Sequence, residues 1–175
     1  MRIGLVALVL TLLSYPAAVG QVVEDHDVQM LLGELFPKAL SFAAKSGNPP
    51  VYKAFATRSG SKRAKLLGYA FWTTEIEPLE RGYDGPIKML VGMDTQGVIT
   101  GVIVTEDHEP FGYFSVETPE FAAQFKGKSV RDRFRVGDDI DAITRATISV
   151  TSASRAVRNS ARRVARAYLV PAKNK

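Results

Sequence analysis

The chain contains no cysteine, only two histidines and a single tryptophan among its 175 residues. The absence of cysteine excludes disulfides, iron–sulfur clusters, thiolate metal sites and thiol nucleophiles. His26 and His108 leave little room for an all-histidine metal site, so we expect no metal centre. No convincing set of catalytic acid, base and nucleophile stands out either. With 46% hydrophobic and 23% charged residues, the composition is that of a folded domain rather than a disordered chain.

Only one long hydrophobic run is present, and it lies at the N-terminus. Ile3 to Leu13 is almost entirely apolar, follows Arg2, and precedes the small residues of Ala18-Val19-Gly20. This layout predicts a secretory signal peptide over residues 1–20. The run is shorter than the roughly 20 residues that cross a bilayer as a helix, although a retained N-terminal anchor is the alternative. We therefore expect a periplasmic or other extracytoplasmic protein.

The rest of the chain alternates between helical and strand patterns. Apolar spacing and breakers predict a helix over 24–44 interrupted at Pro37, strands over 51–57 and 66–74, a hairpin over 87–94 and 98–104, a short helix over 119–125, and a helix over 152–169. This order predicts an α+β fold, with an antiparallel sheet meander packed by helices. Residues 21–80 supply the first helix and strands, 21–170 form one compact unit, and 171–175 are a tail.

The hairpin is the strongest local signal. Two runs rich in β-branched residues flank the turn Thr95-Gln96-Gly97. Because apolar residues are nearly continuous in both runs, we expect both faces of the hairpin to be covered, with helices on at least one.

The last helix is amphipathic and basic. One side carries the arginines Arg155, Arg158, Arg162 and Arg166, whereas the opposite side is apolar. The basic side is either a solvated face or a peripheral contact with an anionic membrane or a redox partner. Nucleic acid is not expected, because no aromatic residues are interleaved with these arginines.

A hydroxyl-rich segment, residues 138–149, precedes this helix. Two interpretations of these residues are open. One is a polar loop followed by a helix with Thr151 or Ser152 as its N-cap. The other is a phosphate-binding corner, formed by the exposed amides and the positive end of the helix dipole.

The pattern Asp141-x-Ile143-Thr144-x-Ala146-Thr147-x-Ser149 resembles the flavinylation motif of the FMN-binding domain family. Such domains occur in Rnf and sodium-pumping quinone reductase complexes and in NosR-type regulators. The resemblance implies that the Thr147 hydroxyl is esterified to the phosphate of FMN. It also implies that an external flavin transferase makes this bond from FAD with a divalent metal. Arg145 stands where the family usually has glycine.

The resemblance extends upstream and covers residues 82–169. Its upstream elements are Gly82-Tyr83-x-Gly85-Pro86-Ile87, the Gly92-Met93-Asp94 hairpin, and His108-Glu109-Pro110-Phe111-Gly112, a variant of the family's histidine-glutamate-threonine-proline-glycine loop without the threonine. The resemblance therefore implies that residues 81–170 form the core of an FMN-binding domain.

The resemblance also assigns roles around the flavin. Thr144, Ala146, Ser149 and Asp141 would shape the attachment site, and the ring would need apolar or aromatic walls, for which Trp72, Tyr83, Phe111 and Tyr113 are candidates. Asp141 is either a residue that orients the loop or a solvated carboxylate. Arg145 pairs with the phosphate or faces solvent. His108 bonds the flavin ring or caps its own loop.

Together these features predict an extracytoplasmic electron-transfer protein with FMN covalently attached to Thr147. We expect a redox carrier rather than a turnover enzyme, because the cofactor supplies the redox chemistry. Its partners would be a flavin transferase and a membrane or periplasmic redox protein. The alternative is a module that binds flavin without a covalent bond, or an accessory or maturation factor of a respiratory complex.

Overall fold

A computed structural model describes residues 25–57 and 64–170. The predicted signal peptide, the basic segment at 58–63 between two predicted strands, and the predicted tail at 171–175 lie outside the described residues. The elements are α1 (His26–Leu35), β1 (Ser41–Phe42), β2 (Tyr52–Phe55), β3 (Leu66–Trp72), α2 (Thr73–Ile76), β4 (Lys88–Asp94), β5 (Ile99–Glu106), the 3-10 turn η1 (Gly112–Phe114), α3 (Pro119–Ala123) and α4 (Thr147–Tyr168).

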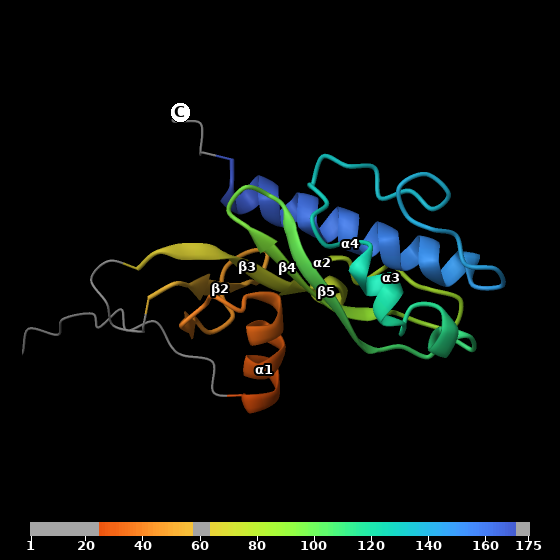
Figure 1. Ribbon diagram of the computed structural model, residues 1–175, viewed down its shortest axis with the longest axis horizontal. Coiled ribbons are helices and arrows are strands. Elements are labelled where there is room, and N and C mark those ends of the chain that lie inside the picture. Colours follow the sequence, from red (N-terminus) through yellow and green to blue (C-terminus); the bar gives the residue numbers. More distant parts are fainter. Residues whose placement is uncertain (1–24, 58–63, 171–175) are drawn as a thin grey trace, which may run out of the picture.

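The five strands form one antiparallel sheet in the order β1-β2-β3-β4-β5. The long helix α4 lies across one face, and α1 lies on the other (Figure 1). The predicted α+β class with an antiparallel meander is confirmed. Among the described residues, no helix is both long enough and apolar enough to span a bilayer.

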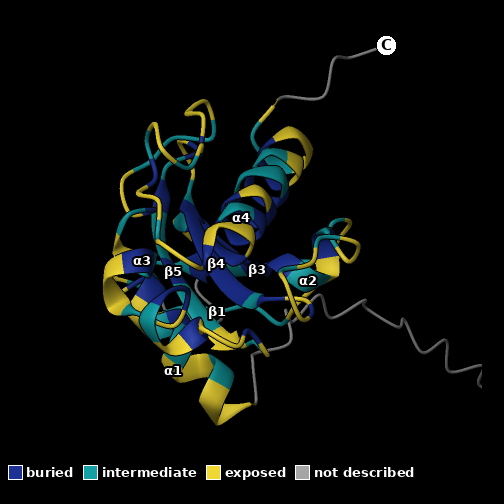
Figure 2. Ribbon diagram, turned by 90° about the vertical axis from the view of Figure 1, so that its right-hand side faces the viewer, coloured by how far each residue is buried: buried dark blue, intermediate teal, exposed yellow. Residues whose placement is uncertain are grey.

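The hairpin of β4 and β5 turns where its sequence predicts. Gly97 adopts a φ of 81°, a left-handed value that favours glycine. The Asp94 carboxylate accepts the backbone N–H groups of Gln96 at 2.8 Å and Val98 at 2.9 Å. Five consecutive residues of β4 are buried, so both faces of this strand are covered as expected, whereas in β5 only Ile99 and Val102 are buried (Figure 2).

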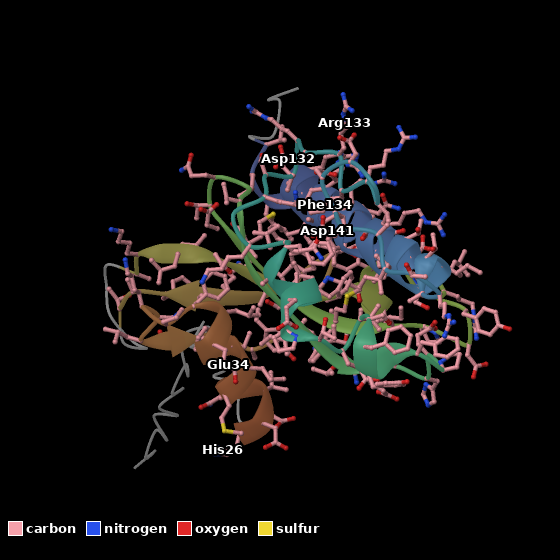
Figure 3. The ribbon with its side chains drawn as sticks, turned by 45° about the vertical axis from the view of Figure 1, so that its right-hand side comes forward. His26, Glu34, Asp132, Arg133, Phe134 and Asp141 are labelled. Carbon is pink, nitrogen blue, oxygen red and sulfur yellow. The ribbon has the colours of Figure 1, made fainter. Side chains whose placement is uncertain are left out.

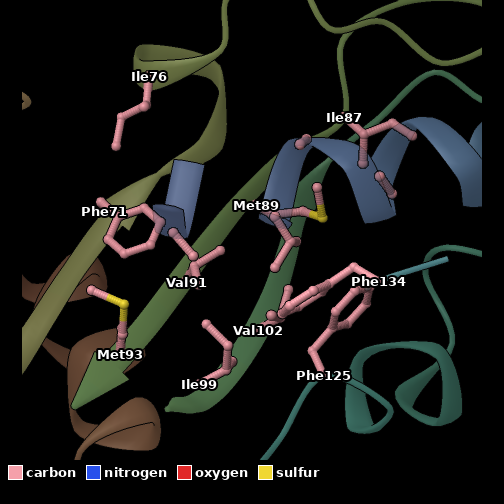
Figure 4. Close-up of a cluster of buried hydrophobic side chains, with 14 of the residues drawn as sticks. Phe71, Ile76, Ile87, Met89, Val91, Met93, Ile99, Val102, Phe125 and Phe134 are labelled. Atoms are coloured by element: carbon pink, nitrogen blue, oxygen red, sulfur yellow. The ribbon is translucent and has the colours of Figure 1, made fainter. Parts of the chain in front are cut away.

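The larger core lies between the sheet and α4. Met89, Val91 and Met93 point into it from β4, and the segment after α3 adds Phe125 and Phe134 (Figure 4). The Phe125 and Phe134 rings stack with centroids 6.2 Å apart. The apolar side of α4 closes this core with Val150, Ala153, Val157, Ala161 and Val164. Each fully buried large apolar side chain here contributes about 1.5–3 kcal/mol.

A smaller core fills the other face of the sheet. Leu32, Leu35 and Phe36 from the α1 end pack against Leu90 and Trp72. Trp72 is only 8% exposed in this cluster. It therefore belongs to the core beneath α1, and its proposed role as a wall for the flavin ring is wrong.

The N-terminal helix is shorter than the expected 24–44. It ends at Leu35, just before Pro37, and Ser41–Phe42 instead pair with β2 as a strand. Proline explains the stop because it disfavours helical backbone in the residue before it and lacks an N–H. The helix starts at a side-chain cap, since the Asp25 carboxylate accepts the Asp27 N–H at 3.1 Å.

The strand expected over 66–74 is also shorter at its end. It gives way at Thr73 to α2, a single helical turn. The buried Thr73 hydroxyl explains the change, because it donates to the Ile87 carbonyl at 3.2 Å and accepts the Met89 N–H at 3.1 Å. These bonds tie the turn to the start of β4.

Candidate functional site

The site is built around the first residue of α4. Arg145 has a φ of 68°, a left-handed conformation that redirects the chain, and the helix begins two residues later at Thr147. The N-cap is Ala146, which offers no side-chain hydrogen bond. The expectation that Thr151 or Ser152 caps the helix is therefore wrong, since both lie inside its first two turns.

The start of α4 presents backbone hydrogen-bond donors that the helix itself does not use. Val150 is the first residue whose N–H bonds back along the helix, to the Ala146 carbonyl at 2.9 Å. The N–H groups of Thr147, Ile148 and Ser149 precede it and have no intrahelical partner. Thr147 is itself exposed. An exposed hydroxyl thus stands beside three amides at the positive end of a long helix, where anions are stabilised.

A cavity of about 580 Å³ opens beside this hydroxyl. One side is the start of α4, and the other side consists of two loops that come from distant parts of the chain. Its lining residues are Tyr83, Pro110, Phe111, Arg145, Ala146, Thr147, Ile148 and Ser149. The Tyr83 and Phe111 side chains are 69% and 41% exposed, so both rings are accessible at the opening. This volume lies within the usual range for small-molecule sites.

Glu109 holds the walls of this cavity together. Its side chain is buried, with 7% exposed. One carboxylate oxygen accepts the Tyr83 N–H at 3.0 Å and the Ser149 hydroxyl, and the other accepts the Asp84 N–H at 3.1 Å. A single carboxylate therefore joins the loop at 82–84, its own loop and the first turn of α4.

Gly82 makes the approach of this carboxylate possible. A Cβ atom at Gly82 would overlap Oε1 of Glu109, at a separation closer than real side chains allow. Glycine is needed here for space, because the carboxylate occupies the position that a side chain would fill.

The groups around the cavity fit FMN. The backbone amides, the Thr147 hydroxyl and the Arg145 guanidinium suit the phosphate. The apolar and aromatic side chains of Tyr83, Phe111 and Ile148 suit a flat ring system. Within the described ranges, no group of three or more histidine, aspartate or glutamate side chains is placed to hold a metal ion.

Comparison with known proteins identifies the family of the part of the chain that contains this cavity. The model of the FMN-binding domain family matches residues 82–162, which include every residue that lines the cavity. The chain carries an FMN-binding domain. The predicted family and the predicted cofactor, FMN, are confirmed.

Several known proteins are similar to this FMN-binding protein. Regulatory protein NosR from Stutzerimonas stutzeri is 29% identical over 90% of the chain, which corresponds to 22% of NosR. A subunit of the ion-translocating oxidoreductase complex from Photorhabdus laumondii is 37% identical over 81% of the chain and 64% of that protein. A subunit of the Na(+)-translocating ferredoxin:NAD(+) oxidoreductase complex from Acetobacterium woodii is 26% identical over 73% of the chain and 70% of that protein. The chain thus spans about a fifth of NosR and about two thirds of these two subunits.

Five of the predicted site residues meet at the cavity of the FMN-binding domain. They are Tyr83, Arg145, Ala146, Thr147 and Ser149. Ser149 is buried, and its hydroxyl donates to Glu109. Ser149 therefore supports the cavity wall through this hydrogen bond to Glu109.

The other three predicted residues do not line the cavity. His108 and Thr144 are exposed outside it. Asp141 donates its backbone N–H to Oε1 of Gln124 at 2.7 Å, but within the described part of the chain its carboxylate accepts no hydrogen bond. Of the remaining candidate ring walls, Phe111 lines the cavity, whereas Tyr113 is exposed beside Phe114 and does not.

Three residues of the site were not among the predicted site residues, although Glu109 and Pro110 lie in the loop that resembles the family. Ile148 and Pro110 line the cavity, and Glu109 holds it together. Glu109 lies in a run of charged residues that normally indicates a solvated loop. Only its upstream partners, which are 25 and 26 residues away, show that it is buried.

Proposed function

We propose that this chain is an extracytoplasmic electron-transfer protein whose FMN is attached covalently through a phosphoester to Thr147. The observation that carries the proposal is the position of Thr147. Its side chain is exposed, lines the cavity of the FMN-binding domain, and stands at the start of α4 among backbone amides that have no intrahelical partner.

Attachment would make one phosphorus–oxygen bond. Oγ1 of Thr147 bonds to the flavin-side phosphorus of FAD, AMP leaves, and the hydroxyl proton passes to solvent. A flavin transferase with a divalent metal would catalyse this exchange, as the family resemblance implies. The amides of Ile148 and Ser149 would then hold the phosphate oxygens at the positive end of the helix. The covalent bond is at the phosphate and does not involve the ring. The cofactor would therefore remain bound when the ring is oxidised or reduced.

The remaining residues would position the ring for electron transfer. Bound FMN supplies one- and two-electron chemistry, which belongs to the cofactor rather than to the protein. Tyr83 and Phe111 would pack against the ring, and their exposure leaves the ring edge accessible to a redox partner. Two of the relatives are subunits of ion-translocating oxidoreductase complexes, which favours a membrane-bound partner of that class.

The location completes the proposal. The pattern at residues 1–20 predicts export, so maturation and electron transfer would take place outside the cytoplasm. A tethered cofactor suits that location because a free flavin would diffuse away. The arginine side of α4 would supply peripheral contact with an anionic membrane surface or with the redox partner.

Intact-mass measurement tests the covalent bond. Protein co-expressed with a flavin transferase should gain the mass of FMN less one water, and Thr147→Ala should abolish this gain. Thr151→Ala is the matched control, because it removes the next hydroxyl on the same side of α4 and should retain the adduct. An unmodified mass for the natural chain would contradict the covalent proposal.

The alternative is a module that binds FMN without a covalent bond and serves as an accessory factor. Arg145 favours it, since a bulky residue takes the place of the usual glycine next to the attachment site. In that case, FMN would bind reversibly to both the natural chain and Thr147→Ala, and neither would gain mass.

A further inference from the structure

A second cavity, of about 510 Å³, lies on the flank of α4. It is bounded on one side by the helix and on the other by the loop that contains Arg133 and Phe134, which runs beside α4 in Figure 3. Its lining residues are Arg133, Phe134, Arg135, Val136, Thr151, Arg155, Arg158 and Arg162. We call it the arginine cleft. It shares no lining residue with the cavity beside Thr147, which we call the flavin cavity after the function proposed for it.

The five guanidinium groups of the arginine cleft are only partly neutralised. Arg133 is paired with Asp138 at 2.7 Å, and Arg155 is paired with Glu80 at 2.7 Å. The other three guanidinium groups, those of Arg135, Arg158 and Arg162, have no carboxylate partner within the described residues. The cleft therefore carries a surplus of positive charge.

The neighbouring carboxylates do not cancel this surplus. Asp132 accepts the backbone N–H of Ser129 at 2.8 Å. Asp139 accepts the backbone N–H groups of Phe134 and Arg135 and forms an ion pair with Lys128 at 3.3 Å. These acids stabilise the loop, and they leave the charges of Arg135, Arg158 and Arg162 without a carboxylate partner among the described residues.

Two arginines are held in place by hydrogen bonds to neutral groups. Arg162 donates to the carbonyls of Val130 at 2.9 Å and Asp132 at 2.7 Å, and Arg158 donates to the side chain of Asn159 at 3.1 Å. Such bonds order the side chains without removing their charge. The guanidinium groups therefore meet a ligand in a preorganised arrangement, which reduces the entropic cost of binding.

We propose that the arginine cleft binds a compact anion that carries more than one phosphate group. Guanidinium groups bond phosphate oxygens in a bidentate manner, and Thr151 adds a hydroxyl from the helix side. Because the positive groups come from two walls of a concave site, a ligand with two phosphate groups can present one group to each wall. This site is independent of flavin attachment.

The phosphate groups have two sources to distinguish, a soluble diphosphate or the headgroup of a phospholipid that carries two phosphates. Calorimetric titration of the purified protein with inorganic pyrophosphate tests the first source. Flotation with vesicles that contain cardiolipin, whose headgroup carries two phosphates, compared with phosphatidylcholine vesicles, tests the second. Binding in either arm that weakens as salt is raised supports the proposal and assigns the source. Absence of binding in both arms overturns it.

Paired variants locate the binding. Arg135→Gln with Arg158→Gln should weaken binding at least tenfold, because both guanidinium groups lack a carboxylate partner. The matched control is Arg131→Gln with Arg166→Gln, which removes the same charge from exposed positions outside the cleft and should alter affinity less than twofold. Thermal unfolding confirms that both pairs remain folded. An equal loss in both pairs would mean general charge attraction and would contradict a defined site.

Discussion

The two cavities beside α4 differ in almost every property except the helix that they share. The flavin cavity lies at the start of the helix, and its opening is apolar and aromatic. The arginine cleft lies along the flank, and its walls carry five guanidinium groups. In the first, backbone amides and one hydroxyl would meet the proposed ligand. In the second, charged side chains would meet it.

Under the two proposals, one helix would support two kinds of recognition. The start of a helix offers fixed N–H donors from the backbone, so an uncharged residue such as Thr147 is sufficient beside it to bind a phosphate. The flank of a helix has no free backbone donors and depends on side chains spaced three or four residues apart, as Thr151, Arg155, Arg158 and Arg162 are. A substitution at one site should therefore weaken binding there and leave binding at the other site unchanged.

The largest expected effect is at Glu109. Glu109→Ala leaves the Ser149 hydroxyl and two backbone N–H groups without their acceptor, which should lower the free energy of unfolding by about 3 kcal/mol. It should also weaken reversible FMN binding by the unmodified chain, since three walls of the flavin cavity lose their connection. Chemical denaturation and fluorescence titration measure the two effects.

Glu120→Ala is the control for this change. Glu120 is an exposed carboxylate in the first turn of α3, so its removal should change the free energy of unfolding by no more than about 0.5 kcal/mol. Equal stability of the two variants would show that Glu109 is not a connecting residue.

The next effect concerns the loop that forms one wall of the arginine cleft. Burial raises the pKa of Asp139, but hydrogen bonds from the backbone of Arg135 and Phe134 and from Lys128 outweigh it, so the pKa lies below its ordinary value. Asp139→Asn should cost about 1–2 kcal/mol at neutral pH, whereas Asp138→Asn, in an exposed ion pair, should cost less than about 1 kcal/mol.

The depressed pKa fixes the sign of the pH dependence. The charged Asp139 stabilises the folded state above its unfolded pKa of about 3.9, and this contribution is lost as the pH falls through the lower folded value. The difference in stability between the natural chain and Asp139→Asn should therefore shrink below about pH 4. A difference that is constant from pH 7 to pH 3 would contradict this role.

A cross-test of the two cavities comes third. Tyr83→Ala should weaken FMN binding by the unmodified chain up to about tenfold, because ring contacts contribute about 0.5–1.5 kcal/mol, and it should leave pyrophosphate binding unchanged. Arg158→Gln should weaken pyrophosphate binding and leave FMN binding unchanged. Fluorescence and calorimetric titrations of both ligands on both variants measure this, and loss of both ligands in either variant would mean that the cavities are coupled.

The smallest effect is expected at Arg145. Arg145→Gly relieves a left-handed conformation that costs about 1 kcal/mol, but it adds a similar conformational entropy to the unfolded chain. The free energy of unfolding should change by less than about 0.5 kcal/mol. Arg131→Gly, at an exposed position without a positive φ, should only destabilise. Denaturation curves compare the two, and equal losses would argue against relief of backbone strain at Arg145.

Much of the scaffold could be predicted from the sequence. The hairpin of β4 and β5 has a turn glycine and continuous apolar runs, and α4 has a clear helical period, so local pattern was sufficient for both. The start of α4 was not predictable, because the segment offers several hydroxyl residues as caps. The left-handed backbone of Arg145 selects among them, and nothing in a single sequence reveals that conformation.

The candidate site was predicted in part for a related reason. Thr147 and Tyr83 lie in motifs that resemble a known family, so both were identified. The bonds of Glu109 and the arginine cleft depend on contacts between distant segments. Arg133 and Arg135 belong to a loop without periodicity, and only the fold brings them beside Arg158.

Peptide mapping by tandem mass spectrometry tests the central claim most directly. Protein matured with a flavin transferase is digested, and the flavin-bearing peptide is sequenced. The flavin phosphate should be on Thr147 alone, and no other hydroxyl of α4 should be modified. Flavin on Thr144 or Thr151, or a fully matured protein without any modified peptide, would contradict the assignment of the start of α4 as the attachment site.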